Sequence, residues 1–240
     1  MTNDGEERSA SDFPYSPSQV RRAGDRIRRA AQRHEAAQQN DLALLDEYRA
    51  WHQPTLERCQ RELVSVFHER LELDPETFAI TGRPLKTVEA ITAKLVRGTR
   101  LNTMRDIAGT RIVVPALDVQ DAVTALVLET FKGHSARIEK DTRVDGDESG
   151  YRALHVVSEL DNRFAEIQVR TKLQDAWAQM VERVDKMLRT DLKHGNGPAD
   201  WGMWLLETSN VFRKWDIGEY GVDIPPTPYD HLLGEEPAPA

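Results

Sequence analysis

Apolar and polar residues alternate strictly along residues 165–170, in the second half of the chain. This period of two predicts a β-strand with Ala165, Ile167 and Val169 on one face and Glu166, Gln168 and Arg170 on the other. A face that holds an acid, an amide and a base is costly to bury in an apolar core. We therefore expect this face to meet water, a metal or a ligand.

An apolar strand at 150–157 precedes this one, and a short loop at 161–163 joins the two into a predicted hairpin. A backbone bend at Gly150 would leave the ring of Tyr151 exposed at the start of the strand. An exposed tyrosine is a stacking platform for a base. A ring that packs on the rim of the sheet is the alternative.

Helical spacing and short apolar runs predict the other elements. The expected helices span about residues 17–38, 41–73 with a kink at Pro54, 87–97, 119–131, 172–190 and 198–215, and further strands are expected at 77–82, within 104–114 and at 137–140. Strands and helices alternate, but two strands follow each other near residue 160. The sequence therefore predicts an α+β domain with a mixed β-sheet, flanked by N- and C-terminal helices.

These elements divide the chain into five expected segments. They are a flexible N-terminus at 1–15, N-terminal helices at 16–75, a core at 76–195, a C-terminal helix at 196–222 and a tail at 223–240.

Composition restricts the class of protein. The net charge of −8 disfavours a generally basic coat for nucleic acid. The single cysteine, Cys59, excludes a disulfide-based fold and suits a reducing, cytoplasmic location. No apolar run approaches the roughly 20 residues of a membrane span, so no membrane partner is expected.

One local basic segment stands out in this acidic chain. The 13 residues from Arg21 hold six arginines and one aspartate on a predicted helix. A solvated helix face is the more common explanation, and contact with a polyanion is the alternative. The candidate residues for that contact are Arg21, Arg22, Arg28 and Arg29.

Cations and carboxylates gather at the edges of the predicted sheet. Lys86 and Lys94 are eight residues apart, a little over two helical turns, and therefore lie on the same side of one helix. Together with Arg83 they suit a polyphosphate at the start of that helix. Asp106 and Glu166 come from two elements of one sheet and could share Mg²⁺, although each acid taken alone is as readily a helix cap or an ion pair.

The sequence lacks the motifs of several common kinds of active site. No His and Cys pair has zinc-ligand spacing, and neither a phosphate-binding loop nor a dinucleotide-binding fingerprint is present. A nucleophile elbow is also missing.

Four segments carry a specific resemblance. Residues 82–94, 106–111, 150–155 and 166–171 occur in the order found in the RelA/SpoT synthetase family, and the similar region runs from about 80 to 190. The resemblance implies a nucleotidyltransferase-like α+β fold that moves pyrophosphate from ATP to a ribose hydroxyl.

The resemblance also implies roles for single residues. Arg83 would stack on the adenine of ATP, and the phosphates would be held by Lys86, Lys94 and Arg111. Asp106 and Glu166 would bind Mg²⁺, with Glu166 helping to deprotonate the acceptor hydroxyl.

On the acceptor side, Tyr151 would stack on the acceptor base. The residues that order the site around the acceptor would be His155, Gln168 and Arg170.

Within this family the chain is most similar to the toxic small alarmone synthetases, through residues 15–24 and 173–183. It resembles synthetase-only members, because the His-Asp hydrolase module of the long members is missing. The similarity implies transfer to the 3′ CCA end of tRNA, which blocks translation, and an antitoxin protein as partner. A homo-oligomer is a further possibility, since small alarmone synthetases often assemble.

The sequence departs from the guanosine-using members at three places. Ala90 stands where many have serine, and Arg183 replaces the histidine of a Glu-His pair. The loop before Gly150 carries acidic residues where those enzymes commonly have lysines. Like charges repel, so this loop disfavours a small, highly phosphorylated acceptor and favours tRNA, gripped by the arginine-rich helix.

Two alternatives remain open at this point. The first is the same enzyme making ppGpp and pppGpp from GDP and GTP. The second is an inactive RNA-binding regulatory domain, against which the presence of both Asp106 and Glu166 argues.

Overall fold

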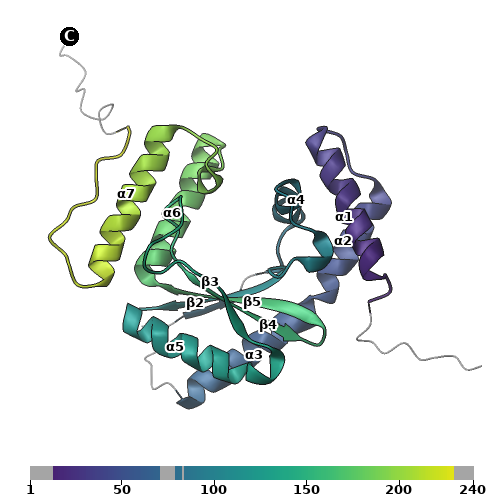
Figure 1. Cartoon of the computed structure of the whole chain (residues 1–240), viewed down its shortest axis with the longest axis horizontal. Helices are drawn as coiled ribbons and strands as arrows, with labels where there is room; N and C mark the ends of the chain where they lie inside the picture. Colours follow the sequence, from purple (N-terminus) through teal and green to yellow (C-terminus); the bar gives the residue numbers. More distant parts are fainter. Residues whose placement is uncertain (1–12, 71–78, 83, 230–240) are drawn as a thin grey trace, which may run out of the picture.

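The computed structural model describes residues 13–70, 79–82 and 84–229. At its centre is a five-stranded sheet in the order β1-β2-β5-β4-β3 (Figure 1). β2 and β5 run parallel and the other neighbouring pairs antiparallel, so the sheet is mixed and the predicted α+β class is confirmed. The strands are β1 (Ala79–Gly82), β2 (Ala108–Val114), β3 (Arg137–Asp141), β4 (Leu154–Leu160) and β5 (Arg163–Thr171).

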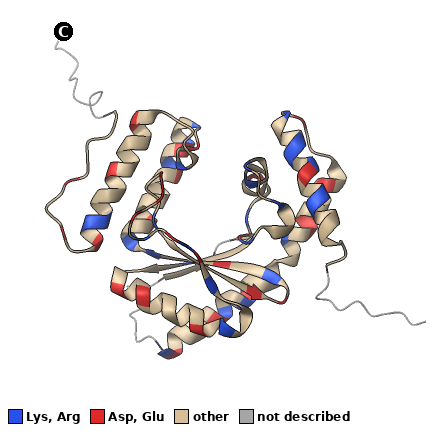
Figure 2. Ribbon diagram, viewed as in Figure 1, with Lys and Arg blue, Asp and Glu red and all other residues tan. Residues whose placement is uncertain are grey.

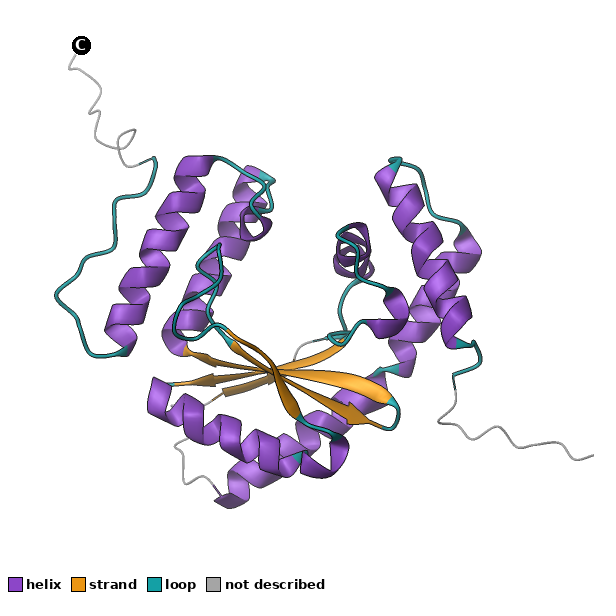
Figure 3. Cartoon of the chain, in the orientation of Figure 1, coloured by secondary structure: helices purple, strands orange, loops and turns teal. Residues whose placement is uncertain are grey.

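Helices cover both faces of this sheet. They are α1 (Pro17–Gln32), α2 (Gln39–Trp51), α3 (Gln53–Arg70), α4 (Val88–Val96), α5 (Leu117–Thr130), α6 (Lys172–Leu188) and α7 (Ala199–Asp216), with short 3-10 turns η1 (Leu101–Thr103), η2 (Lys132–His134) and η3 (Leu192–His194). Figure 3 shows α3 and α5 beneath the sheet. Above it, α6 and α7 form one wall, and α4 with α1 and α2 forms the other. No helix among the described residues is long and apolar enough to cross a membrane.

The β4–β5 hairpin forms as the sequence predicts. Asp161 and Asn162 make its turn with φ of 52° and 60°, which short polar side chains tolerate and which matches the twist of a two-residue hairpin. Along β5, Ala165, Ile167 and Val169 enter the core against α3 and α5. The predicted alternation is therefore confirmed, and the polar side chains of β5 face the space between the two walls.

Three predicted boundaries are wrong. The helix expected at 41–73 is two helices, because α2 ends at Trp51 and α3 begins at Gln53, with Pro54 in its first turn where proline is tolerated. The helix expected at 17–38 ends at Gln32, followed closely by His34 with φ 56°. Parts of the expected segments 1–15, 77–82 and 223–240 lie outside the described residues.

The third error concerns β4, which begins at Leu154 rather than at Gly150. Residues 150–153 instead form a loop that packs against α7 at Gly150. Gly150 has φ +87°, and a Cβ there would lie 3.0 Å from the Cβ of Ser209 and 3.2 Å from the Cα of Leu206. Only glycine fits this left-handed close approach without strain.

Replacing Gly150 by alanine should therefore lower the free energy of unfolding by about 2–3 kcal/mol, from backbone strain and from overpacking against α7. Gly98→Ala is the matched control, because Gly98 has φ +100° and no atom near its added Cβ. Gly98→Ala should carry the backbone strain alone, about 1–2 kcal/mol. Urea unfolding measures the free energy of unfolding of both variants. An equal loss in Gly150→Ala and Gly98→Ala would contradict this account.

Candidate active site

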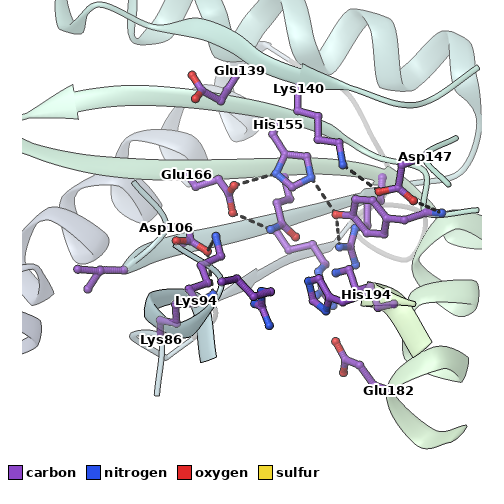
Figure 4. Close-up of a pocket in the computed structure, with 18 of the residues that line it drawn as sticks. Lys86, Lys94, Asp106, Glu139, Lys140, Asp147, His155, Glu166, Glu182 and His194 are labelled. Atoms are coloured by element: carbon purple, nitrogen blue, oxygen red, sulfur yellow. Dashed lines mark hydrogen bonds and ion pairs between the residues drawn. The ribbon is translucent and has the colours of Figure 1, made fainter. Parts of the chain in front are cut away.

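A cavity of about 440 Å³ lies on the open face of the sheet, between the two helical walls. Figure 4 shows residues that line it. This volume is in the range of small-molecule sites. The residues singled out from the sequence that line it are Lys86, Lys94, Asp106, Arg111, Tyr151, His155, Glu166, Gln168 and Arg170. Arg83 lies outside the described residues.

Two lysines converge on one carboxylate at the α4 side of the cavity. The Nζ atoms of Lys86 and Lys94 each donate to Asp106 Oδ2 at 2.7 Å. Thr87 caps α4 by accepting from the backbone N–H of Ala90, which places Lys86 just before the helix and Lys94 two turns along it. The other oxygen, Asp106 Oδ1, is buried and has no hydrogen-bond partner among the described residues.

Glu166 is held from both sides on β5. His155 Nδ1 lies 2.8 Å from Glu166 Oε1, and Gln168 Nε2 donates to Oε2 at 2.7 Å (Figure 4). Burial alone would raise the pKa of Glu166, but the hydrogen bonds from His155 and Gln168 and the charge of Lys94 lower it to about 2. The carboxylate is therefore ionised at neutral pH and is a weak base.

This pKa gives Glu166 a pH-dependent effect on stability. The folded pKa of about 2 is below the ordinary value of 4.5, so Glu166 stabilises the fold above pH 4.5. That contribution is lost as pH falls from 4.5 towards 2. The difference in unfolding free energy between wild type and Glu166→Gln should shrink between pH 5 and 3. A difference that stays constant over this range would contradict the depressed pKa.

Tyr151 corrects a prediction from the sequence. Its ring is not an exposed platform, since Tyr151 is only 3% exposed and packs in a cluster with Trp177. Its hydroxyl lies 2.8 Å from His155 Nε2 and accepts from Arg170 Nη2 at 2.6 Å. Lys193 Nζ lies 4.3 Å from the ring centroid. Stacking on a base therefore requires Lys193 to leave the ring, and that role stays a prediction.

His155 links these groups into one chain. Its Nδ1 lies 2.8 Å from Glu166 Oε1 and its Nε2 lies 2.8 Å from the Tyr151 hydroxyl, which accepts from Arg170 Nη2. Two buried polar atoms of the same face, Gln168 Oε1 and Arg170 Nε, have no partner among the described residues. Buried polar groups of this kind are commonly satisfied by a bound water or ion, or serve a catalytic role.

The sequence reasoning missed Asp175, in the first turn of α6. Its Oδ1 forms an ion pair with Arg111 Nη1 at 3.0 Å and accepts from Arg170 Nη1 at 3.2 Å, and its side chain is 10% exposed. Asp175 thus fixes two arginines of the cavity. The sequence pattern that could have indicated Asp175 is an acid in the first turn of a helix that directly follows a strand. Such an acid lies close to the last residues of the strand, and it is favoured by the positive end of the helix dipole.

The acidic loop before Gly150 also differs from expectation. Asp147 turns inward, where it accepts from Lys140 Nζ at 2.9 Å and from the backbone N–H groups of Ser149 and Tyr151 at 3.1 Å. Hydrogen bonds from Ser149 and Lys140 outweigh the opposing effect of burial and lower the pKa of Asp147. Asp145 and Glu148 remain exposed. The loop therefore presents less negative charge to the cavity than its sequence suggests.

The arginine-rich helix α1 packs beside α4 and is partly neutralised (Figure 2). Arg26 pairs with Asp41 at 2.6 Å and Arg28 with Asp25 at 3.2 Å. Arg21 and Arg22 are exposed and have no ion pair among the described residues. Arg29 is exposed as well and donates to the backbone oxygen of Asp25 at 3.2 Å. Folding thus leaves α1 with less uncompensated positive charge than the six arginines of residues 21–33 suggest.

The carboxylates fit a magnesium ion that arrives with a nucleotide. The described residues hold no group of three His, Cys, Asp or Glu side chains suited to a metal by themselves. Mg²⁺ typically takes one or two carboxylates and completes its shell with phosphate oxygens and water. Asp106, with its unpartnered oxygen, and Glu166 would be those ligands.

Comparison with known proteins identifies the central segment. Residues 82–185 match the family described as the region found in RelA / SpoT proteins. The match covers the central segment and less than half of the chain. This region spans the strands and loops that supply Lys86, Asp106 and Glu166.

Two solved structures and one curated protein extend the comparison. Small alarmone synthetase 1 from Bacillus subtilis bound to its product pppGpp has a TM-score of 0.58 and 23% identity, over 72% of this chain and 94% of that one. The same synthetase bound to AMPCPP has a TM-score of 0.50 and 20% identity, over 72% and 94%. These likenesses establish the fold.

The curated protein is the uncharacterized protein Rv1366 of Mycobacterium tuberculosis. It is 32% identical over 174 residues, which cover 70% of this chain and 58% of that protein. The chain thus spans somewhat more than half the length of the curated relatives it matches.

Proposed function

We propose that the protein is a Mg²⁺-dependent ATP pyrophosphotransferase that acts on a ribose 3′-hydroxyl. The observation that carries this proposal is the convergence of two lysines on Asp106 in the cavity that also holds the ionised Glu166. Transfer of phosphoryl-type groups depends on positioning and charge neutralisation, and these side chains supply both.

In this reaction the acceptor 3′-oxygen attacks the β-phosphorus of ATP, the bond from that phosphorus to the α-phosphate oxygen breaks, AMP leaves, and the proton of the hydroxyl is released to water. Lys86, Lys94 and Arg111 bind the phosphates and offset the charge that develops on them. A bound Mg²⁺ would add Lewis-acid stabilisation of the same oxygens. Glu166 accepts a hydrogen bond from the attacking hydroxyl and orients it. Its low pKa suits this orienting role better than full proton abstraction.

For the acceptor we propose the 3′ CCA end of tRNA. Asp145 and Glu148 stay exposed on the loop beside the cavity, although Asp147 is balanced by Lys140, and these two acids would disfavour a phosphate-rich free nucleotide. Arg21 and Arg22 are exposed cations on α1 that would suit the backbone of a tRNA. A tRNA with a pyrophosphate on its 3′ end cannot be aminoacylated. The protein would then act as a growth-arresting toxin, controlled by an antitoxin protein.

Synthesis of ppGpp or pppGpp from GDP or GTP is the second candidate. It is favoured by the pppGpp bound to a protein of the same fold. Lys140 and Lys193, near the Tyr151 ring, are also cations of the kind that bind acceptor phosphates.

Incubation with ATP labelled in its γ-phosphate separates these acceptors. We expect label on tRNA and its loss when periodate has first destroyed the 3′ ribose diol. GDP and GTP, supplied alone, should remain unlabelled. Label that appears only in a guanosine nucleotide would contradict the tRNA proposal and support the second candidate. Label in neither acceptor would contradict both.

A further inference from the structure

Asp175 contacts two arginines of the candidate active site without lining the cavity itself. It lies in the first turn of α6 and is 7% exposed. Its Oδ1 lies 3.0 Å from Arg111 Nη1 and 3.2 Å from Arg170 Nη1, and both arginines line the cavity. Its Oδ2 accepts from Gln179 Nε2, one turn further along α6, at 2.6 Å. Both oxygens of the carboxylate are therefore bonded, and the orientation of the group is fixed.

The shared oxygen holds two like charges close together. Arg111 comes from β2 and Arg170 from β5, which are neighbouring parallel strands. Like charges repel, and a carboxylate between them offsets that repulsion. The side chain of Arg170 is 3% exposed, and Asp175 is its one carboxylate partner among the described residues. A buried guanidinium that loses such a partner is strongly unfavourable, so the position of Arg170 depends on Asp175.

Arg170 connects this carboxylate to the acceptor side of the site. Its Nη2 donates to the Tyr151 hydroxyl at 2.6 Å, and that hydroxyl lies 2.8 Å from His155 Nε2. His155 Nδ1 in turn lies 2.8 Å from Glu166 Oε1. A movement of Arg170 would therefore be passed along this chain to the carboxylate of Glu166.

We propose that Asp175 is a positioning residue that sets the donor phosphates and the attacking hydroxyl relative to each other. Towards the donor it fixes Arg111, which binds phosphates in the proposed function. Towards the acceptor it fixes Arg170 and, through the chain of hydrogen bonds, Glu166. The inference rests on the proposed function, because the phosphates and the hydroxyl are those of that reaction. A misplacement of about 1 Å between reacting groups can lower a rate by about 10²-fold.

Asp175→Asn keeps the size of the side chain and removes its charge. The two arginines should then move apart, and kcat for pyrophosphate transfer should fall by about 10–100-fold with whichever acceptor wild type labels. The dissociation constant of AMPCPP, an unreactive analogue of ATP, should stay within about threefold of wild type, because the cations that bind phosphate keep their charges. Intact binding of AMPCPP also shows that the variant is folded.

Asp118→Asn is the matched control. Asp118 is likewise an acid in the first turn of a helix, α5, but it is exposed and forms no ion pair among the described residues. Its substitution removes the same charge from the same position of a helix, so any effect of the helix dipole is included. This variant should keep the kcat of wild type.

Gln179→Ala tests the same carboxylate by a milder change. Gln179 is exposed, so its loss should leave the fold intact. Without its hydrogen bond to Oδ2 the Asp175 carboxylate can turn, and kcat should fall by about 3–10-fold, the effect of one hydrogen bond. Affinity for AMPCPP should again be unchanged.

The outcomes distinguish this inference from the proposed function. A wild-type protein that transfers pyrophosphate to no acceptor overturns both. With an active wild type, a normal kcat in Asp175→Asn overturns the positioning role alone, and so does a loss of AMPCPP affinity as large as the loss of kcat. If Asp175→Asn does not fold, Gln179→Ala decides: a lowered kcat with normal AMPCPP affinity supports the role, and a normal kcat overturns it.

Discussion

Glu166→Gln should lower kcat for pyrophosphate transfer by about 10²–10⁴-fold, the range found when a group that assists proton movement is removed. In the proposed mechanism, the substitution removes the negative charge that would meet the attacking hydroxyl and the metal. It should leave the fold intact, because Gln168 can rotate its amide so that Oε1, which has no partner among the described residues, accepts from the new amide.

Glu159→Gln provides the matched control for this variant. Glu159 is an exposed acid on the adjacent strand β4, outside the cavity, and its loss should leave the rate within about twofold of wild type. The measurement is the transfer rate of wild type and of both variants at saturating concentrations of ATP and acceptor. A Glu166→Gln enzyme with normal kcat and only a raised KM would contradict the role given to this carboxylate.

Asp106→Asn should lower kcat/KM by about 10²–10³-fold and move the Mg²⁺ dependence to higher concentration. An amide oxygen is a weaker magnesium ligand than a carboxylate, and a neutral side chain no longer holds Lys86 and Lys94 together. Titration of the transfer rate with Mg²⁺ measures both effects.

The control for this variant is Asp46→Asn. The Asp46 side chain is 61% exposed and forms a surface ion pair with Arg49. It should show wild-type rates and an unchanged Mg²⁺ midpoint. The metal-binding role of Asp106 would be refuted by a normal midpoint in Asp106→Asn, whatever the loss of rate.

The parts of the site that are local in sequence could be predicted from it. The alternation along β5 identified the polar face of Glu166, Gln168 and Arg170, because one buried face fixes the register of a strand. The spacing of Lys86 and Lys94 placed them on one side of a helix, and the structure joins them through Asp106.

The parts that depend on distant packing could not be predicted. The burial of Tyr151 depends on α6 and α7, since its cluster includes Trp177 and Trp201. Lys193 lies over the Tyr151 ring. The segment before it is held by a hydrogen bond of 2.6 Å from the backbone N–H of Leu192 to Asp185 Oδ1, and no pattern in the sequence predicts this contact.

Charge counting failed for a similar reason. Arg26 is neutralised by Asp41, 15 residues away on the next helix, and Asp147 by Lys140 across a loop. A count of charges along one segment omits partners that folding brings from another. The same omission hid Asp175, whose two arginines lie on β2 and β5.

The central claim is that this cavity moves an intact pyrophosphate group. The most direct test is to identify the nucleotide released from ATP during transfer, together with the mass gained by the acceptor. Our account predicts one AMP per modified acceptor and the mass of a diphosphate on its 3′-hydroxyl. Release of ADP would indicate transfer of a single phosphoryl group, and release of pyrophosphate would indicate nucleotidyl transfer. Either result would contradict the account.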